Sequence, residues 1–126
     1  MKRKAIKRKS KRNKFGNIRV ETFDGVKHAS KKEAARWLFL LDQQTKGVIR
    51  DLRRQVRHPL HVCGVKIGTC IPDFEYVVCD SGKEIVEDVK SFRTARLPLF
   101  RRNKRHMMAE FGIDVIEVFN PQEPVV

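Results

Sequence analysis

The chain has 126 residues, of which 40% are apolar, and its 28 Lys and Arg against 15 Asp and Glu give a net charge of +13. This size allows one domain with a single core, and the charge indicates a polyanionic partner, because each Lys or Arg that neutralises a phosphate releases counterions. No apolar run is long enough to span a bilayer, and no apolar stretch follows the basic start as a secretory signal requires. The three cysteines, an odd number, then indicate reduced thiols and a cytoplasmic protein.

The N-terminal segment carries most of the excess charge. Residues 1–14 hold nine basic residues and no acidic one, whereas the rest of the chain holds 19 basic against 15 acidic residues. Such a segment cannot bury a core and repels itself, so we expect a disordered basic tail that orders on nucleic acid, although a localisation signal or a solubilising segment has the same composition. The folded domain is expected at residues 15–120, and a C-terminal tail at 121–126. The DNA-binding candidates in the basic tail are Lys2, Arg3, Lys4, Lys7, Arg8, Lys9, Lys11, Arg12 and Lys14.

The first half of the folded part predicts two short strands and a helix. Segments 18–23 and 26–29 are typical of strands around an Asp24-Gly25 turn. Ser30-Lys31-Lys32-Glu33 is a capping-box pattern, and Lys46-Gly47 supplies a C-terminal signal, so we predict a helix at 31–46. The apolar residues at helical spacing in this segment are Ala34, Trp37, Leu38 and Leu41.

The second half predicts strands, then a helix and a last strand. We predict a loosely alternating strand at 53–60, a hairpin of 60–63 and 65–69 around Gly64, and strands at 70–79 and 83–90 on either side of an Asp80-Ser81-Gly82 turn. A helix at 96–111 ends at Gly112, and a strand at 113–119 follows. This order is typical of an α/β domain with a central mixed β-sheet flanked by helices, in which 83–90 and 113–119 would be joined by a right-handed crossover if they are parallel.

Two acidic residues and a lysine lie on the neighbouring strands around that turn. Pro72-Asp73 opens one strand, and Asp88-Val89-Lys90 closes the next, with fourteen residues between the two acids. Side chains alternate along a strand, so Asp88 and Lys90 share a face, and the turn can bring Asp73 to the same place. Paired carboxylates suit Mg²⁺, with Mn²⁺ as a substitute, and a nearby lysine can serve an attacking water. The cluster therefore predicts metal-assisted hydrolysis of phosphodiesters.

At these residues the sequence resembles the restriction-endonuclease-like superfamily, which is named for its Pro-Asp…(Asp/Glu)-x-Lys motif. Further similarity to small phage endonucleases lies in the Ser-Lys-Lys-Glu-Ala helix start, Gln55, Pro-Asp-Phe and Val-Glu-Asp-Val-Lys-Ser-Phe-Arg-Thr, and covers about residues 15–118. The resemblance implies a restriction-endonuclease-like core with Asp73, Asp88 and the Val89 carbonyl as metal ligands. It also implies that Glu33 supports a second metal or its waters and that Lys90 acts on the attacking water. The superfamily includes phage Holliday-junction resolvases of similar length.

Each of these residues also has a plainer interpretation. Asp73 suits a turn after Pro72, and Asp88 with Lys90 would be a weak ion pair if exposed. Glu33 completes the capping box without any catalytic role, and Gln55 either orients a ligand or satisfies a strand edge. Zinc is disfavoured because the sequence lacks the paired short spacings of a zinc site. The residues considered for zinc are His58, His61, His106, Cys63 and Cys70.

Basic residues after the Asp-x-Lys strand are expected to hold DNA. A charged helix is usually a solvated face, but beside an acidic site it must offset repulsion of the phosphates. The candidates are Arg93, Thr94, Arg96, Arg101, Arg102, Lys104 and Arg105. No base-reading motif is visible in the sequence, which favours recognition of DNA shape, such as a branch or junction, and symmetric cutting of a junction implies a homodimer. The expected function is a metal-dependent DNA endonuclease of phage DNA metabolism. The alternatives are a non-catalytic basic nucleic-acid-binding protein with the same fold, and a basic component of a ribonucleoprotein.

Overall fold

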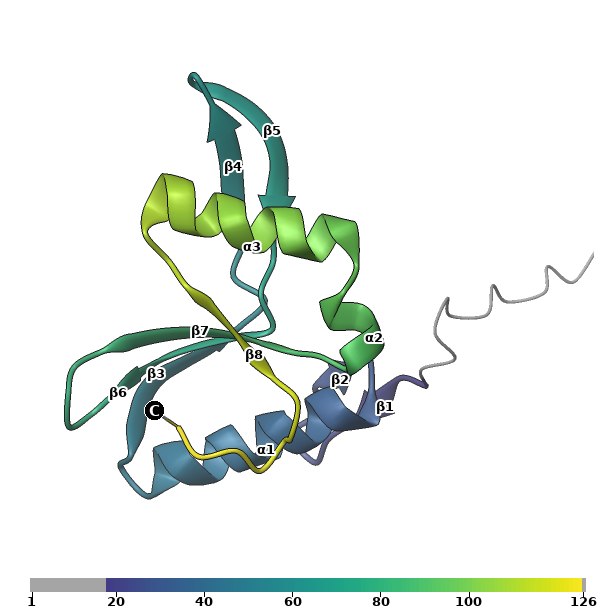
Figure 1. Ribbon diagram of the computed structural model, residues 1–126. Helices are drawn as coiled ribbons and strands as arrows, with labels where there is room; N and C mark the ends of the chain where they lie inside the picture. The colour runs from purple at the N-terminus through teal and green to yellow at the C-terminus, as the bar shows by residue number, and fades with distance from the viewer. Residues whose placement is uncertain (1–17, 126) are drawn as a thin grey trace, which may run out of the picture.

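A four-stranded mixed sheet forms the centre of the protein, in a computed structural model that describes residues 18–125 (Figure 1). Its strands lie in the order β3 (Ile49–Arg54), β6 (Phe74–Val78), β7 (Glu84–Val89) and β8 (Val115–Val118). β6 is antiparallel to both of its neighbours, whereas β8 is parallel to β7. The expected mixed sheet is therefore confirmed, and its last two strands, whose direction the sequence left open, are parallel.

Helices cover the two faces of this sheet (Figure 1). The face under α1 (Lys31–Thr45) and the face under α3 (Pro98–Phe111) each bury an apolar cluster. The α1 cluster consists of Trp37, Leu40, Ile49, Phe74, Tyr76, Val78 and Ile85, and the α3 cluster of Leu60, Cys70, Val86, Met107 and Val115. No helix within residues 18–125 is long and apolar enough to cross a membrane.

The first helix forms as the capping signals predict. Ser30 is its N-cap, and its hydroxyl accepts a hydrogen bond from the Glu33 N–H at 3.1 Å. At the other end Gly47 takes a left-handed conformation with φ 75°, which costs glycine little because it has no Cβ. The buried stripe is shifted from the expected one, because Leu40 is fully buried whereas Leu38 is 40% exposed.

The predicted helix at 96–111 corresponds to α3 alone, which starts two residues later than expected, at Pro98. A separate short helix that was not predicted, α2 (Phe92–Ala95), precedes it. Leu97 between them is extended, with ψ 131°, because a proline disfavours the helical conformation of the residue before it. Pro98 itself is favourable in the first turn, where its missing N–H is not needed. Gly112 ends α3 in a left-handed conformation, as predicted.

The predicted strand at 53–60 was wrong. β3 ends at Arg54, and Gln55 then takes a positive φ of 52°, which turns the chain out of the sheet. β4 (His58–Val62) and β5 (Val65–Cys70) form a separate hairpin beyond α3, with Gly64 in its turn as expected (Figure 1). The first two strands are shorter than predicted: β1 (Val20–Glu21) and β2 (Lys27–His28) pair with each other only.

A buried ion pair joins α1 to the sheet and to the end of the chain. Arg36, 1% exposed, donates from Nε and one terminal nitrogen to the two Glu87 carboxylate oxygens at 2.7 and 3.0 Å. The Tyr76 hydroxyl donates to the same carboxylate at 2.7 Å. The remaining guanidinium nitrogen donates to the carbonyls of Pro121 and Glu123. The segment expected as a C-terminal tail is therefore attached to the domain, at least through Glu123.

Candidate active site

The strand register brings the two predicted aspartates face to face. β6 and β7 pair with Phe74 opposite Glu87 and Glu75 opposite Val86. One step further along this ladder Asp73 lies opposite Asp88, and side chains at opposing positions leave the same face of a sheet. The turn after β6 thus brings the two aspartates to one face of the sheet, as the sequence pattern predicted. Glu87 points to the other face, where it pairs with Arg36.

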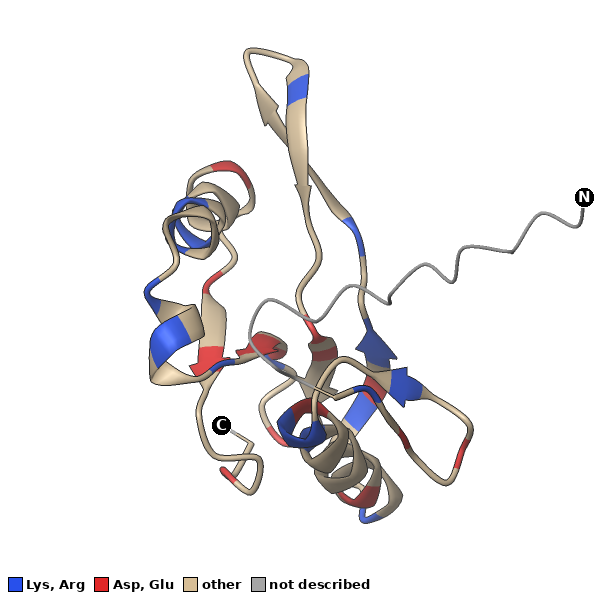
Figure 2. Ribbon diagram, turned by 90° about the vertical axis from the view of Figure 1, so that its right-hand side faces the viewer, with Lys and Arg blue, Asp and Glu red and all other residues tan. Residues whose placement is uncertain are grey.

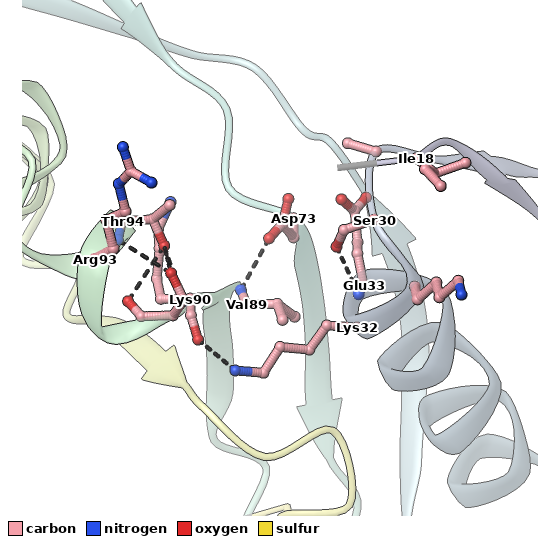
Figure 3. A pocket seen from close by; sticks show the side chains of 12 residues that line it. Ile18, Ser30, Lys32, Glu33, Asp73, Val89, Lys90, Arg93 and Thr94 are labelled. Carbon is pink, nitrogen blue, oxygen red and sulfur yellow. Dashed lines mark hydrogen bonds between the residues drawn. The ribbon is translucent and has the colours of Figure 1, made fainter. Parts of the chain in front are cut away.

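Reciprocal hydrogen bonds fix the two carboxylates against the ends of the strands. The Asp73 N–H donates to Asp88 Oδ1 at 2.9 Å. In return the Val89 N–H donates to Asp73 Oδ2 at 2.9 Å (Figure 3). Each carboxylate therefore uses one oxygen to hold the neighbouring strand. The other oxygen of Asp88, Oδ2, lies 3.8 Å from Lys90 Nζ.

Lys90 is held in place by contacts from three sides. Its N–H donates to the Val118 carbonyl at 2.8 Å, which continues the β7–β8 ladder by one residue. Its carbonyl accepts from Lys32 Nζ at 2.8 Å, and its own ammonium lies 4.2 Å from the centre of the Phe100 ring. These contacts fix the backbone of Lys90, and its ammonium lies close to both the Phe100 ring and Asp88 Oδ2.

Electrostatic repulsion is built into this cluster. Burial raises the pKa of Asp73 well above its usual range, and the nearby Asp88 and Glu33 carboxylates raise it further. Burial also raises the pKa of Asp88, against the opposing effect of the Lys90 ammonium. Buried carboxylates this close to one another resist ionising together, so a bound cation would stabilise the charged form.

Glu33 reaches the same cluster from the first turn of α1. Its backbone N–H completes the Ser30 cap, but its carboxylate is 6% exposed, and Oε1 is buried without a hydrogen-bond partner. The same oxygen lies 3.7 Å from His28 Nδ1 and 4.0 Å from an Arg54 guanidinium nitrogen. Capping therefore uses only the backbone of this residue and leaves its carboxylate available to a ligand.

His28 is a neighbour of the site that sequence reasoning missed. Its Nε2 lies 3.2 Å from the Thr22 hydroxyl, whose proton goes to Asp24 or to the Val26 carbonyl, so Nε2 is the donor. Burial lowers the pKa of His28, which keeps the ring neutral at pH 7 and leaves Nδ1 as an acceptor. His28 Nδ1 and Glu33 Oε1 are thus two neighbouring buried acceptors, and neither receives a hydrogen bond. A cation or a water bound between them would satisfy both.

A cleft of about 710 Å³ opens over these residues (Figure 3). Glu33, Asp73, Val89 and Lys90 line it together, whereas Asp88 is buried and is not among the lining residues. Basic side chains line both walls: Lys31 and Lys32 come from α1 and Arg93 from α2. In Figure 2 acidic segments lie near the middle of the molecule and also at its edges, with basic segments on the helices and strands around them. Lys31 and Lys32 were not predicted as residues of this site, although they directly precede Glu33 in the first turn of α1.

The predicted DNA-binding residues fall into separate groups. Arg93 and Thr94 line the cleft, and Arg96 is exposed just after α2. On α3, Arg101 and Lys104 pair with Glu117 at 3.0 and 3.5 Å, whereas Arg102 and Arg105 are exposed and line a small hollow away from the cleft. The nine basic residues of the 1–14 segment lie outside the described residues.

Gln55 reaches the site through its backbone. Its N–H donates to the Asp73 carbonyl at 3.0 Å, while the residue is exposed and absent from the lining of the cleft. A positive φ at a residue other than glycine is strained. The hydrogen bond from this strained residue joins the chain after β3 to Asp73, so Gln55 supports the position of that aspartate.

The donor set of the cluster fits a hard cation. Within residues 18–125 no group of three or more His, Cys, Asp or Glu side chains is arranged to hold a metal ion by itself. Mg²⁺ needs fewer protein ligands, because one or two carboxylates with water and substrate phosphate complete its shell. The other histidines serve different contacts: His58 pairs with Glu75, and His61 and His106 pair with Glu110.

No family model, curated protein or solved structure matches this chain, so its function can be proposed only from its own residues and their geometry.

Proposed function

We propose that this protein is a metal-dependent DNA endonuclease with a restriction-endonuclease-like active site. The observation that carries the proposal is the opposition of Asp73 and Asp88 at the ends of two paired strands, with the Lys90 ammonium 3.8 Å from Asp88. A protein that only binds a polyanion has no use for buried carboxylates, since they repel phosphate. A bound cation would offset this repulsion, so buried carboxylates are expected where a cation and a phosphate bind together.

The residues have distinct roles in this proposal. Asp73 and Asp88 hold Mg²⁺ or Mn²⁺ with the Val89 carbonyl, and Glu33 supports a second ion or its waters. The bound ion would polarise the scissile phosphate. Lys90 orients the attacking water and balances the charge that develops as the water oxygen bonds to phosphorus. The attacking water gives up a proton to solvent as its oxygen bonds to phosphorus, the bond from phosphorus to the leaving sugar oxygen breaks, and that oxygen takes up a proton from solvent.

The two basic walls of the cleft offset the repulsion between the acidic floor and DNA. Lys31 of α1 and Arg93 of α2 line the cleft together with Asp73, which suits them to the phosphates that flank the scissile one. The 1–14 segment would add contacts that do not depend on sequence. We propose selectivity for branched DNA or Holliday junctions in phage DNA metabolism in the host cytoplasm, by a homodimer that presents two sites.

Cleavage by the purified full-length chain tests this proposal. The substrates are a labelled four-way junction, a linear duplex of the same sequence and a linear RNA, each with Mg²⁺, with Mn²⁺ or with chelator. We expect metal-dependent cutting of DNA that is lost in Asp88→Asn and in Lys90→Ala. The matched controls are Asp80→Asn and Lys83→Ala, which remove the same charges from exposed positions in the turn between the same two strands.

The outcomes separate the candidate functions. Binding of DNA without cutting under any metal condition would leave the non-catalytic alternative, and a preference for RNA without metal dependence would indicate a ribonucleoprotein component. Equal cutting of junction and duplex would remove the selectivity for branches and leave the nuclease intact. Loss of activity in the Asp80 and Lys83 controls would show that net charge, and not the cluster, is responsible.

A further inference from the structure

An exposed aromatic stack lies beside the cleft. Phe92, the first residue of α2, is 77% exposed although its ring stacks on Phe119, with ring centres 5.2 Å apart and planes 23° from parallel. One face of the Phe92 ring is thus covered by Phe119, and most of the rest is open. A phenylalanine this exposed gains little from burial on folding, so packing does not account for it.

Both rings are held by the backbone around them. Ser91 caps α2 through a complete capping box with Thr94, which fixes the start of the helix that carries Phe92. The N–H of Phe119 donates to the Glu123 carboxylate at 3.2 Å, within a turn that Arg36 anchors. A rigid aromatic surface loses little entropy when a flat ligand stacks on it.

The stack is continuous with the basic wall of the cleft. Residues on either side of Phe92, namely Ser91 and Arg93, line the cleft, while Phe92 itself stands outside it. Lys32, which also lines the cleft, lies with its ammonium 6.0 Å from the centre of the Phe119 ring. A strand whose phosphate lies in the cleft would therefore carry a neighbouring base past Phe92.

We propose that Phe92, supported by Phe119, is a stacking platform for an unpaired base of single-stranded or branched DNA. This inference rests on the proposed function and narrows its substrate class. An aromatic ring stacks on any base, but only where the base is not already stacked in a duplex. The basic residues beside the ring hold the backbone of the same strand, as in proteins that bind single strands without reading their sequence.

The test is binding in chelator, where nothing is cut. Fluorescence anisotropy of the full-length chain measures the dissociation constant for a labelled single strand of about 15 nucleotides and for a hairpin duplex of the same sequence. We expect Phe92→Ala to weaken single-strand binding by roughly tenfold and duplex binding by less than about twofold. Phe92→Trp keeps the flat surface and should bind the single strand at least as well as the native chain.

Leu99→Ala is the matched control, because Leu99 is another apolar residue with 61% exposure, on the neighbouring helix α3. It should bind both DNAs as the native chain does, and circular dichroism would show that every variant is folded. An unchanged single-strand affinity in Phe92→Ala would overturn the platform, as would an equal loss on both DNAs or a loss in Phe92→Trp equal to that in Phe92→Ala. Since cutting is absent from the assay, this result is independent of whether the protein is a nuclease.

Discussion

The pair of Arg36 and Glu87 offers a sharp test of what holds the active site together. Both side chains are 1% exposed, so solvent does not screen them. Arg36→Met keeps much of the volume of the side chain but removes its hydrogen bonds to Glu87 and to the C-terminal carbonyls. The Glu87 carboxylate would then be buried with only the Tyr76 hydroxyl as a partner.

The expected loss of stability is large. Removing one partner of a buried ion pair costs about 3–5 kcal/mol, because the remaining charge has no compensation. A domain of this size is stable by only about 5–15 kcal/mol, so Arg36→Met should unfold at much lower denaturant concentration. The double variant Arg36→Met/Glu87→Met leaves no unpaired charge, and we expect it to be more stable than Arg36→Met alone.

Urea unfolding at pH 7, followed by circular dichroism, would measure the free energy of unfolding for the native chain, both single variants and the double variant. The cycle isolates the coupling of the two side chains if the denaturant slopes agree. A loss below about 1 kcal/mol in Arg36→Met would refute the reasoning, since that is the range of an exposed pair. So would a double variant less stable than either single one.

Four further predictions concern the site and its surroundings. Asp73 and Asp88 have raised pKa values in the folded state, so their ionisation lowers the stability of the fold as pH rises above the usual carboxyl pKa. Without metal at pH 7, Asp88→Asn should therefore melt at a higher temperature than the native chain, and this difference should disappear at pH 3. Mg²⁺ should raise the melting temperature of the native chain and not of Asp88→Asn, and an equal shift in both would refute binding at this cluster. Arg93→Ala should weaken duplex binding and reduce its salt dependence more than Arg102→Ala, measured by anisotropy at several salt concentrations. Gly112→Ala should cost about 1 kcal/mol in urea unfolding, because its φ of 67° is unfavourable for alanine; no change would show that the helix end can rearrange.

Signals that act over a few residues were read correctly from the sequence. The Ser30 cap and the Gly112 stop depend only on neighbouring backbone groups, and the structure places both as predicted. The opposition of Asp73 and Asp88 was also accessible, because alternation along two strands and one short turn determine it. The start of α3 at Pro98 was missed, although the same local rules indicate it, because a proline disfavours a helical conformation of Leu97.

Features that depend on distant segments were not accessible in this way. Arg36 looks like a solvated charge on a helix, and only the approach of Glu87 and of the C-terminal carbonyls explains its burial. His28 and Arg54 reach Glu33 from β2 and from the end of β3, so no spacing within one element indicates them. The positive φ of Gln55 has no signal either, because glycine or asparagine is the usual residue in that conformation.

The ladder between β6 and β7 has a consequence for variation in the turn that joins them. That turn, around Ser81, is exposed, so exchanges of one residue for another should be tolerated there. A change in the length of the turn has a larger effect. If the strand shifted by one position to absorb an insertion or deletion, Glu87 would exchange faces with Asp88, and each carboxylate would meet the other's partner. The chain can therefore accept new side chains in this loop far more readily than an odd change in its length.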